Sequence, residues 1–128
     1  MQPYGQIERY NMGELITLKE MCRRERVTRR MVQGYEQKKL VFAAATNKYG
    51  HLLYNEEAQK RVKRIRLYQQ FGFSLDDIKK LFDLPNKELK IRLELQIQVM
   101  QEKREAYGQL INEAKDIISK LEEENIGE

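Results

Sequence analysis

A long segment near the end of the chain, residues 86–124, limits the possible folds more than any other part of the sequence. Mostly apolar residues recur in it with heptad spacing, at Met100, Tyr107, Ala114 and Leu121 and at the complementary positions Lys103, Leu110, Ile117 and Glu124. This spacing is typical of a coiled-coil helix, although Lys103 and Glu124 interrupt the seam. A helix of about 35 residues extends ~50 Å at ~1.5 Å per residue.

Such a rod cannot bury its apolar stripe against the small globule that precedes it, so we expect it to pair with a second copy of the chain. The expected dimerisation residues are Met100, Tyr107, Leu110, Ala114, Ile117 and Leu121. One pattern conflicts with this prediction: alternate residues from Leu89 to Val99 are apolar, which is the spacing of a β-strand. We still predict a helix, because Leu, Gln, Lys and Glu dominate this stretch and the heptads continue it.

Two short helices are predicted near the start of the chain. Thr17 and Glu20 form a T-x-x-E capping box that opens a helix over residues 18–25. Its buried stripe, at i, i+3 and i+4, is Leu18, Met21 and Cys22. A turn of about three residues follows, and Thr28 caps a second helix over 28–38. Helix, tight turn and helix is the arrangement of the helix-turn-helix DNA-binding motif.

The second of these helices carries side chains that suit a major groove. Arg29 and Gln33 share one stripe with Arg30 beside them, whereas Val32 and Tyr35 point into a core. Arginine binds guanine or phosphate with two donors, and glutamine can bind adenine. Tyr35 is expected to keep its ring in the core and to place its hydroxyl at a phosphate. The alternative is that the arginines are surface charges without a partner.

A small hairpin, or wing, is predicted over residues 41–54. Two short extended pieces, Val41-Phe42 and Leu52-Leu53-Tyr54, flank the turn-prone stretch Thr46–Gly50. Asn55 then caps a helix over about 56–71, which Gly72 ends. We expect this helix to bury Val62, Ile65 and Leu67/Tyr68 and to expose Lys60, Arg61, Lys63, Arg64 and Arg66. A second capping box, Ser74 and Asp77, opens a short helix that buries Leu75, Ile78 and Leu81/Phe82 before Pro85.

Charge is divided unevenly along the 128 residues. Residues 1–87 hold 18 Lys and Arg against 10 Asp and Glu, a net charge of +8, and residues 88–128 hold 6 against 10, a net charge of −4. A basic first part suggests a polyanionic partner, although surface solubility is an alternative explanation. The expected organisation is a loose arm over 1–14, a DNA-binding domain over 15–85, the coiled coil over 86–124 and a tail over 125–128.

Other classes of function lack the residues they need. The lone cysteine, Cys22, fits packing in a reducing cytoplasm better than a metal site, which needs two or more ligands. There is one histidine, His51, and no Gly-rich phosphate loop, so we expect neither an enzyme nor a cofactor. We find no apolar run of about 18 residues and no secretory start, and expect a cytoplasmic protein.

The order of these elements resembles that of the MerR family of bacterial transcription regulators. TLKEMCRRERVTRRMVQGYEQKKLV is similar to the family's opening motif, with Tyr35-Glu36 near the end of the recognition helix and Leu40-Val41 after it. LLYNEEAQKRVKRIRLYQQFGFSLDDIKKLF is similar to its third and fourth helices. The fold class is then mainly α: a winged helix-turn-helix domain followed by a long dimerising coiled-coil helix.

Three departures from the family pattern stand out. Arg26 replaces the usual glycine of the first turn, and Gln33-Gly34 replaces an Arg-Tyr pair in the recognition helix. His51-Leu52-Leu53-Tyr54 fills the place of a Tyr-Arg-x-Tyr motif, so the wing arginine is missing and Lys48 or His51 is the candidate to replace it. The expected DNA-binding residues are therefore Thr28, Arg29, Arg30, Gln33, Tyr35, Lys38, Lys48, His51, Arg61 and Arg64.

The resemblance implies a homodimer, with antiparallel pairing of the coiled coil, on a pseudo-palindromic promoter site that it distorts. It implies double-stranded DNA as the main partner and RNA polymerase as a further candidate. The chain ends where most members begin an effector-binding domain, so we expect a short form with no effector, with a small apolar molecule, or with a sensing partner protein. The rival functions are an architectural or chromosome-organising DNA binder and a protein-interaction module in which the coiled coil is the active part.

Overall fold

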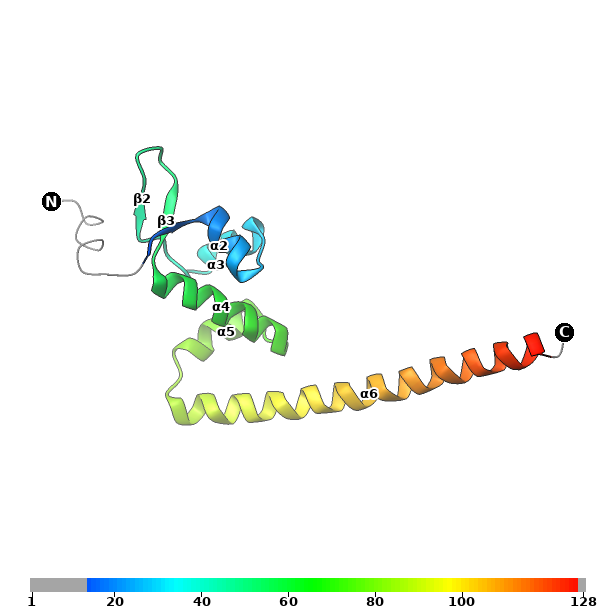
Figure 1. The fold of residues 1–128 in the computed structure, drawn as a ribbon. Coiled ribbons are helices and arrows are strands. Elements are labelled where there is room, and N and C mark those ends of the chain that lie inside the picture. The colour runs from blue at the N-terminus through cyan, green and yellow to red at the C-terminus, as the bar shows by residue number, and fades with distance from the viewer. Residues whose placement is uncertain (1–13, 127–128) are drawn as a thin grey trace. The chain divides into compact units, whose positions relative to one another are not determined.

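The computed structural model describes residues 14–126 of the chain, which divides into two compact units between Asp83 and Leu84 (Figure 1). Of the expected arm and tail, all but Glu14 and residues 125–126 lie outside the described residues. The elements of the first unit are β1 (Ile16–Thr17), α2 (Leu18–Glu25), α3 (Arg29–Gln37), β2 (Ala45–Thr46), β3 (Leu52–Tyr54), α4 (Glu56–Phe71) and α5 (Leu75–Phe82). The second unit contains α6 (Asn86–Ile126), so the mainly helical fold class predicted from the sequence is confirmed.

Four helices begin at the caps that the sequence predicts. The side chains of Thr17, Thr28, Asn55 and Ser74 each accept a hydrogen bond from the backbone N–H three residues later, at 3.2, 3.0, 2.9 and 3.2 Å. Each bond satisfies a donor that the first turn of a helix leaves without a partner. The expected reciprocal half of the first capping box is wrong: the Glu20 carboxylate instead accepts from the guanidinium groups of Arg23 and Arg24.

The sheet has a strand that the sequence analysis missed. Its order is β1-β3-β2, all antiparallel, and Ile16 lies opposite Tyr54 while Ala45 lies opposite Leu53. The first strand of the hairpin is also displaced from the predicted Val41-Phe42 to Ala45–Thr46. The apolar side chains of Leu40 and Val41 are buried in the connection that follows α3 and do not belong to a strand. Pairing with β3 begins only at Ala44, whose N–H donates to Leu53 O at 2.8 Å.

The core of the first unit lies between the helices and the sheet. Its fully buried large side chains are Met21, Val32, Tyr35, Val41, Tyr54, Val62, Ile65, Ile78 and Leu81. Each such side chain contributes about 1.5–3 kcal/mol relative to leaving it in water. Of the pair Leu67/Tyr68, Tyr68 points inward, whereas Leu67 is 42% exposed. Leu18, Cys22, Leu75 and Phe82, predicted to be buried, are only partly so.

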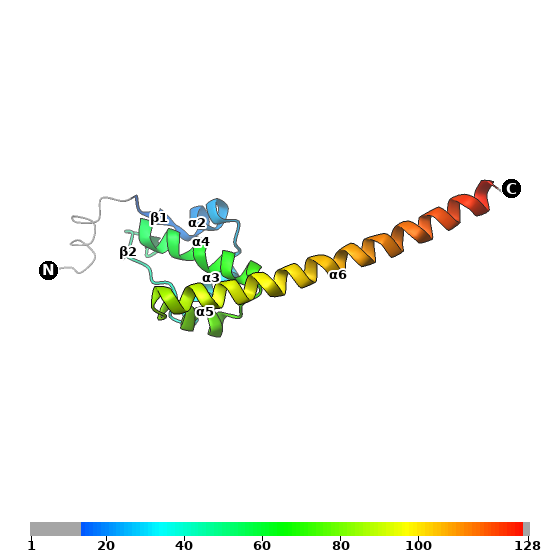
Figure 2. The same cartoon turned by 90° about the horizontal axis from the view of Figure 1, so that it is seen from below.

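The second unit contains the helix predicted for residues 86–124. Figure 2 shows α6 as one continuous helix, drawn from yellow to red, so the strand-like alternation of Leu89 to Val99 does not form a strand. Its apolar side chains remain largely exposed, as at Tyr107 (66%) and Ile117 (60%). Among the described residues, no helix is both long and apolar enough to cross a membrane.

Candidate nucleic-acid interface

The exposed face of α3 carries the side chains expected to read DNA. Arg29, Arg30 and Gln33 are exposed, while Val32 and Tyr35 on the opposite face are fully buried. Within residues 14–126, the side chains of Arg29, Arg30 and Gln33 make no hydrogen bond or ion pair. Their donors are therefore available to a ligand outside the chain. Two arginines and a glutamine on one helical face can bind base edges and phosphates.

The Tyr35 hydroxyl does not fit the expected phosphate contact. It donates to Gln69 Oε1 at 2.7 Å, and the side chain has no accessible surface. Burial raises the pKa of this phenol, in keeping with a neutral hydroxyl held inside the protein. Tyr35 therefore joins α3 to α4, and we remove it from the set of DNA-contacting residues. The sequence could not reveal this bond because its two partners are 34 positions apart.

The hairpin is attached to α3 by a similar contact. The Tyr54 hydroxyl at the end of β3 donates to Glu36 Oε1 at 2.8 Å, and Tyr54 is fully buried. Burial is the largest cause that raises the pKa of this phenol, and the bond to Glu36 adds to it. Because the hydroxyl stays protonated, the link persists over the physiological pH range. The hairpin thus keeps a fixed position relative to the recognition helix.

The tip of the hairpin presents the predicted Lys48 and His51 to solvent, together with Tyr49. Asn47 Oδ1 accepts from the backbone N–H groups of Tyr49 and His51 at 2.9 and 3.0 Å, which fixes the turn. Gly50 has φ 81°, a conformation that glycine adopts without strain. Lys48 Nζ lies 5.1 Å from the ring centroid of Tyr49, which is 71% exposed. Tyr49 is an exposed residue of this tip that is not among the predicted contacts, and its place in the predicted turn is the only sequence signal for it.

Two basic side chains of α4, Arg61 and Arg64, have partners inside the first unit. Arg61 Nε donates to Leu40 O at 2.9 Å, and its guanidinium carbon lies 3.6 Å from the ring centroid of Phe82. Arg64 Nη1 donates to the Tyr68 hydroxyl at 3.4 Å. Arg61 and Arg66, predicted to face outward, are in fact half-buried. The basic cluster of α4 therefore serves packing as well as charge.

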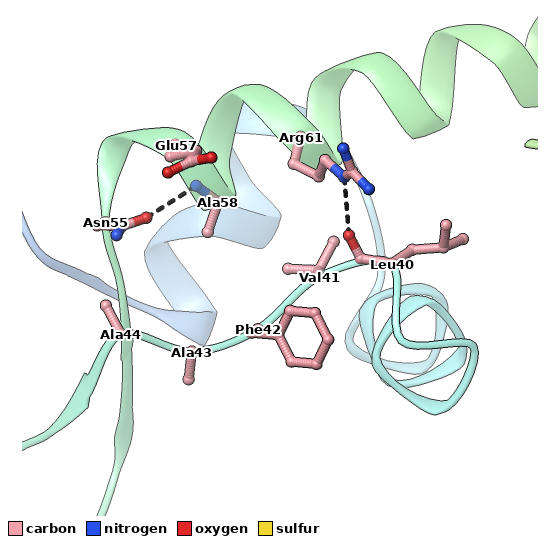
Figure 3. Close-up of a pocket in the computed structure, with 9 residues that line it drawn as sticks. All are labelled: Leu40, Val41, Phe42, Ala43, Ala44, Asn55, Glu57, Ala58 and Arg61. Atoms are coloured by element: carbon pink, nitrogen blue, oxygen red, sulfur yellow. Dashed lines mark hydrogen bonds between the residues drawn. The ribbon is translucent and has the colours of Figure 1, made fainter. Parts of the chain in front are cut away.

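Arg61 also forms one wall of a groove of about 380 Å³ (Figure 3). The groove runs between the segment that follows α3 and the first turns of α4. Its lining residues are Leu40, Val41, Phe42, Ala43, Ala44, Asn55, Glu57, Ala58 and Arg61. The bond from Arg61 to Leu40, dashed in Figure 3, holds these two walls together beside the end of the recognition helix. Arg61 is thus oriented toward this connection rather than extended from α4.

The turn between α2 and α3 contains a residue in the left-handed region. Arg26 caps α2 with φ 55° and ψ 45°, and its backbone N–H donates to Cys22 O. Thr28 follows in an extended conformation and caps α3. Lys39, just after α3, also has a positive φ of 59°. A left-handed conformation costs a residue with a side chain about 1–2 kcal/mol, so both positions favour glycine on backbone grounds.

Lys38, the last predicted contact of α3, is paired with a carboxylate. Its Nζ lies 2.8 Å from Asp76 Oδ1 in the first turn of α5, and both side chains are exposed. This bridge lowers the pKa of Asp76, with smaller contributions from Lys80 and Lys79. No local pattern in the sequence could reveal this contact, because its two partners are 38 positions apart.

These elements define the chain as a winged helix-turn-helix protein. The family model described as "MerR HTH family regulatory protein" matches residues 16–84, and the one described as "MerR, DNA binding" matches residues 59–123. The chain therefore belongs to the MerR family of helix-turn-helix regulatory proteins, which confirms the resemblance seen in the sequence. The members of this family are described as regulatory proteins, which are not a class of enzymes.

Two curated proteins illustrate the similarity. The HTH-type transcriptional activator mta of Bacillus subtilis (strain 168) is 27% identical over 94 residues, which cover 73% of this chain and 37% of that protein. The nodulation protein NolA of Bradyrhizobium elkanii is 36% identical over 85 residues, which cover 61% of this chain and 38% of that protein. The chain thus spans little more than a third of the length of these relatives.

Three solved structures share the fold. A MerR-family transcriptional regulator from Bacillus cereus has a TM-score of 0.70 at 19% identity and covers 84% of this chain and 82% of its own. The N-terminal part of the Bacillus subtilis multidrug transporter activator, MtaN, has a TM-score of 0.62 at 24% identity, and the match covers 80% of this chain and 97% of that one. HiNmlR, a MerR-family regulator lacking the sensor domain and bound to promoter DNA, has a TM-score of 0.59 at 16% identity. That match covers 71% of this chain and 77% of the HiNmlR chain.

Proposed function

We propose that this chain regulates transcription by binding double-stranded DNA as a homodimer. The observation that carries the proposal is the exposed face of α3, where the side chains of Arg29, Arg30 and Gln33 make no hydrogen bond or ion pair within residues 14–126. Membership of the MerR family and the likeness of the fold to a regulator bound to promoter DNA support it. Arg29, Arg30 and Gln33 would contact bases in the major groove. Thr28, Lys38, Lys48, His51 and Arg64 would contact phosphates, and Arg61 is a weaker candidate because of its internal contacts.

The second part of the proposal is that α6 pairs with α6 of another copy. Its expected heptad seam extends upstream through Leu89, Leu93 and Gln96 with the same three- and four-residue spacing. Exposed apolar side chains at Tyr107 and Leu110 would be buried in this seam. Because the coiled-coil spacing runs through most of a 41-residue helix, the interface would be long enough to hold a stable dimer.

Charge along α6 supports an antiparallel arrangement. Residues 86–95 contain three basic and two acidic side chains, whereas residues 116–126 contain one basic and four acidic side chains. Antiparallel pairing places the basic start of each helix beside the acidic end of its partner, whereas parallel pairing places like charges together.

A two-fold dimer would present two copies of α3 to one face of the duplex, so its site would be pseudo-palindromic. Distortion of the promoter between the half-sites would be the switch in transcription.

The proposal is tested by DNA binding of the double variant Arg29→Ala with Arg30→Ala. The probe is a labelled duplex from the region upstream of the protein's own gene, and the readout is the dissociation constant over a range of salt concentrations. We expect the affinity to fall at least about 100-fold in the dimer, since each direct contact contributes about 1–3 kcal/mol. The slope of log K against log salt should also become shallower.

The matched control is Lys115→Ala with Lys120→Ala, which removes the same charge from exposed positions of α6. It should change the affinity less than about threefold, because neither lysine is among the residues proposed to contact DNA. An unchanged affinity and salt slope in the Arg29 and Arg30 variant would contradict DNA reading by α3. A footprint that covers the fragment without discrete sites would favour an architectural role over a regulatory one.

A further inference from the structure

A carboxylate lies beside the proposed DNA-reading surface. Arg30, Gly34 and Lys38 follow one another at i, i+4 and i+8, so they form one edge of the exposed face of α3. The start of α5 lies along this edge: a Cβ at Gly34 would lie 4.0 Å from Leu75 Cδ1, and Lys38 Nζ lies 2.8 Å from Asp76 Oδ1. Lys38, at the end of this edge, is the side chain proposed above to contact a DNA phosphate, which carries the negative charge of the duplex.

The bridge between Lys38 and Asp76 contributes little to folding. The side chains are 45% and 72% exposed, and exposed ion pairs of this kind are weak and screened by salt. The other two contributors to the lowered pKa of Asp76 are Lys79 and Lys80, which lie farther along α5. The bridge therefore leaves Lys38 free to exchange one anionic oxygen for another.

We propose that Asp76 acts as an internal substitute for a DNA phosphate, which occupies Lys38 in the free protein and weakens DNA binding by this face. This inference rests on the proposed DNA-binding function. On binding, Lys38 moves from the carboxylate to a phosphate, and the Asp76 carboxylate is left close to the polyanion. Both effects act against binding. The contact thereby sets the affinity below the value that the basic residues of α3 alone would give.

Replacing Asp76→Asn removes the carboxylate charge and keeps the shape of the side chain. Exposed ion pairs are weak, and their usual contribution corresponds to a factor of about 1.4 to 5 per subunit. Because a dimer contains two copies, we expect DNA binding about two to 25 times tighter. In wild type the carboxylate left beside the phosphate offsets the charge of Lys38, so its removal should make log K fall more steeply with log salt, by up to about 0.9 for each subunit.

Asp77→Asn is a closely matched control. Asp77 is the next residue in the same first turn, and the change alters the net charge and the interaction with the helix dipole in the same way. The cap at Ser74 is retained because its donor is the Asp77 backbone N–H. Within residues 14–126 no salt bridge is formed by Asp77, so this variant should give less than half of the logarithmic gain of Asp76→Asn.

The decisive comparison adds Lys38→Met. In that background the gain from Asp76→Asn should fall to the level of the Asp77→Asn control, and the salt slope should no longer increase. The probes are a random-sequence 30-base-pair duplex and the fragment upstream of the protein's own gene. Thermal melting of each variant, compared with wild type, verifies that the fold is retained.

Three results would overturn the proposal: no gain from Asp76→Asn, an equal gain from Asp77→Asn, or a gain that persists in full with Lys38→Met. These are distinct from failure of the proposed function, which would appear as absence of wild-type binding to both probes.

Discussion

The two units of this protein differ in how far they bury their apolar side chains. In the first unit, helices of 8–16 residues bury Val32, Ile65 and Ile78 completely. In α6, Leu110, Ile117 and Leu121 are more than half exposed. A buried side chain is satisfied within its own unit, whereas an exposed heptad seam requires a second helix. The comparison indicates that the proposed reading surface forms within a single chain, whereas the proposed pairing of α6 would need a second copy.

The strongest way to break this comparison is to charge the seam. Leu110→Glu with Ile117→Glu should lower the dimer affinity at least about 100-fold, because both carboxylates would be desolvated in the interface. Sedimentation equilibrium should then report a monomer at micromolar concentration. The control is Asn112→Glu with Ser119→Glu, which adds the same charge on the opposite face of α6. Each control position lies two residues after a seam residue. If the two double variants dissociate equally, the seam has been misassigned.

The next largest effect contrasts a buried and an exposed residue of α4. Ile65→Ala should lower the free energy of unfolding by about 2–5 kcal/mol, since it leaves a cavity in a fully packed core. Leu67→Ala, two positions along the same helix, should cost less than about 1 kcal/mol because its side chain is 42% exposed. Urea denaturation of both variants measures the difference. Equal losses would contradict the inward direction assigned to this face.

A smaller effect should come from the backbone of the turn between α2 and α3. Arg26→Gly should raise the free energy of unfolding by up to about 1 kcal/mol, because glycine adopts the φ of 55° without the steric cost of a side chain. Lys80→Gly, in the last turn of α5, has no such strain to relieve and should destabilise by about 0.5–1 kcal/mol. Thermal unfolding of the two variants should therefore shift in opposite directions. If both variants were less stable than wild type, backbone strain at Arg26 would be excluded.

The smallest expected effect is a pH dependence at Glu20. Hydrogen bonds from Arg23, then Arg24, lower the pKa of this carboxylate from 4.5 to about 2. Because the folded pKa lies below the unfolded value, the contribution is fully present above about pH 4.5 and is lost as pH falls toward 2. Glu20→Gln should therefore melt below wild type at pH 7 and approach it near pH 2. A difference in melting temperature that is independent of pH would exclude this carboxylate as the cause.

The sequence could predict helices more reliably than sheet. Thr28, Asn55 and Ser74 are local signals that act within one turn, so each helix start was readable from a few residues. The two-residue strand Ile16–Thr17 has no measurable periodicity, and its partner is nearly 40 positions away. The apolar character of Val41 predicts a strand, but in the structure Val41 is buried in the connection that follows α3.

The candidate site shows the same division. The exposed stripe of α3 follows from helical spacing alone, and Arg29, Arg30 and Gln33 lie where that spacing puts them. The bonds that decide the roles of Tyr35 and Lys38 join α3 to Gln69 and Asp76 through space. Such contacts leave no periodic trace in a single sequence, so they became visible only in the folded chain.

The central claim is that two paired chains present two copies of α3 to one duplex. Hydroxyl-radical footprinting of the fragment upstream of the protein's own gene tests it most directly. The account predicts two protected patches related by a dyad, with centres separated by a whole number of helical turns of about 10–10.5 base pairs. Both patches should be absent with Arg29→Ala and Arg30→Ala. A single unsymmetrical patch, or unchanged protection in that variant, would contradict the claim.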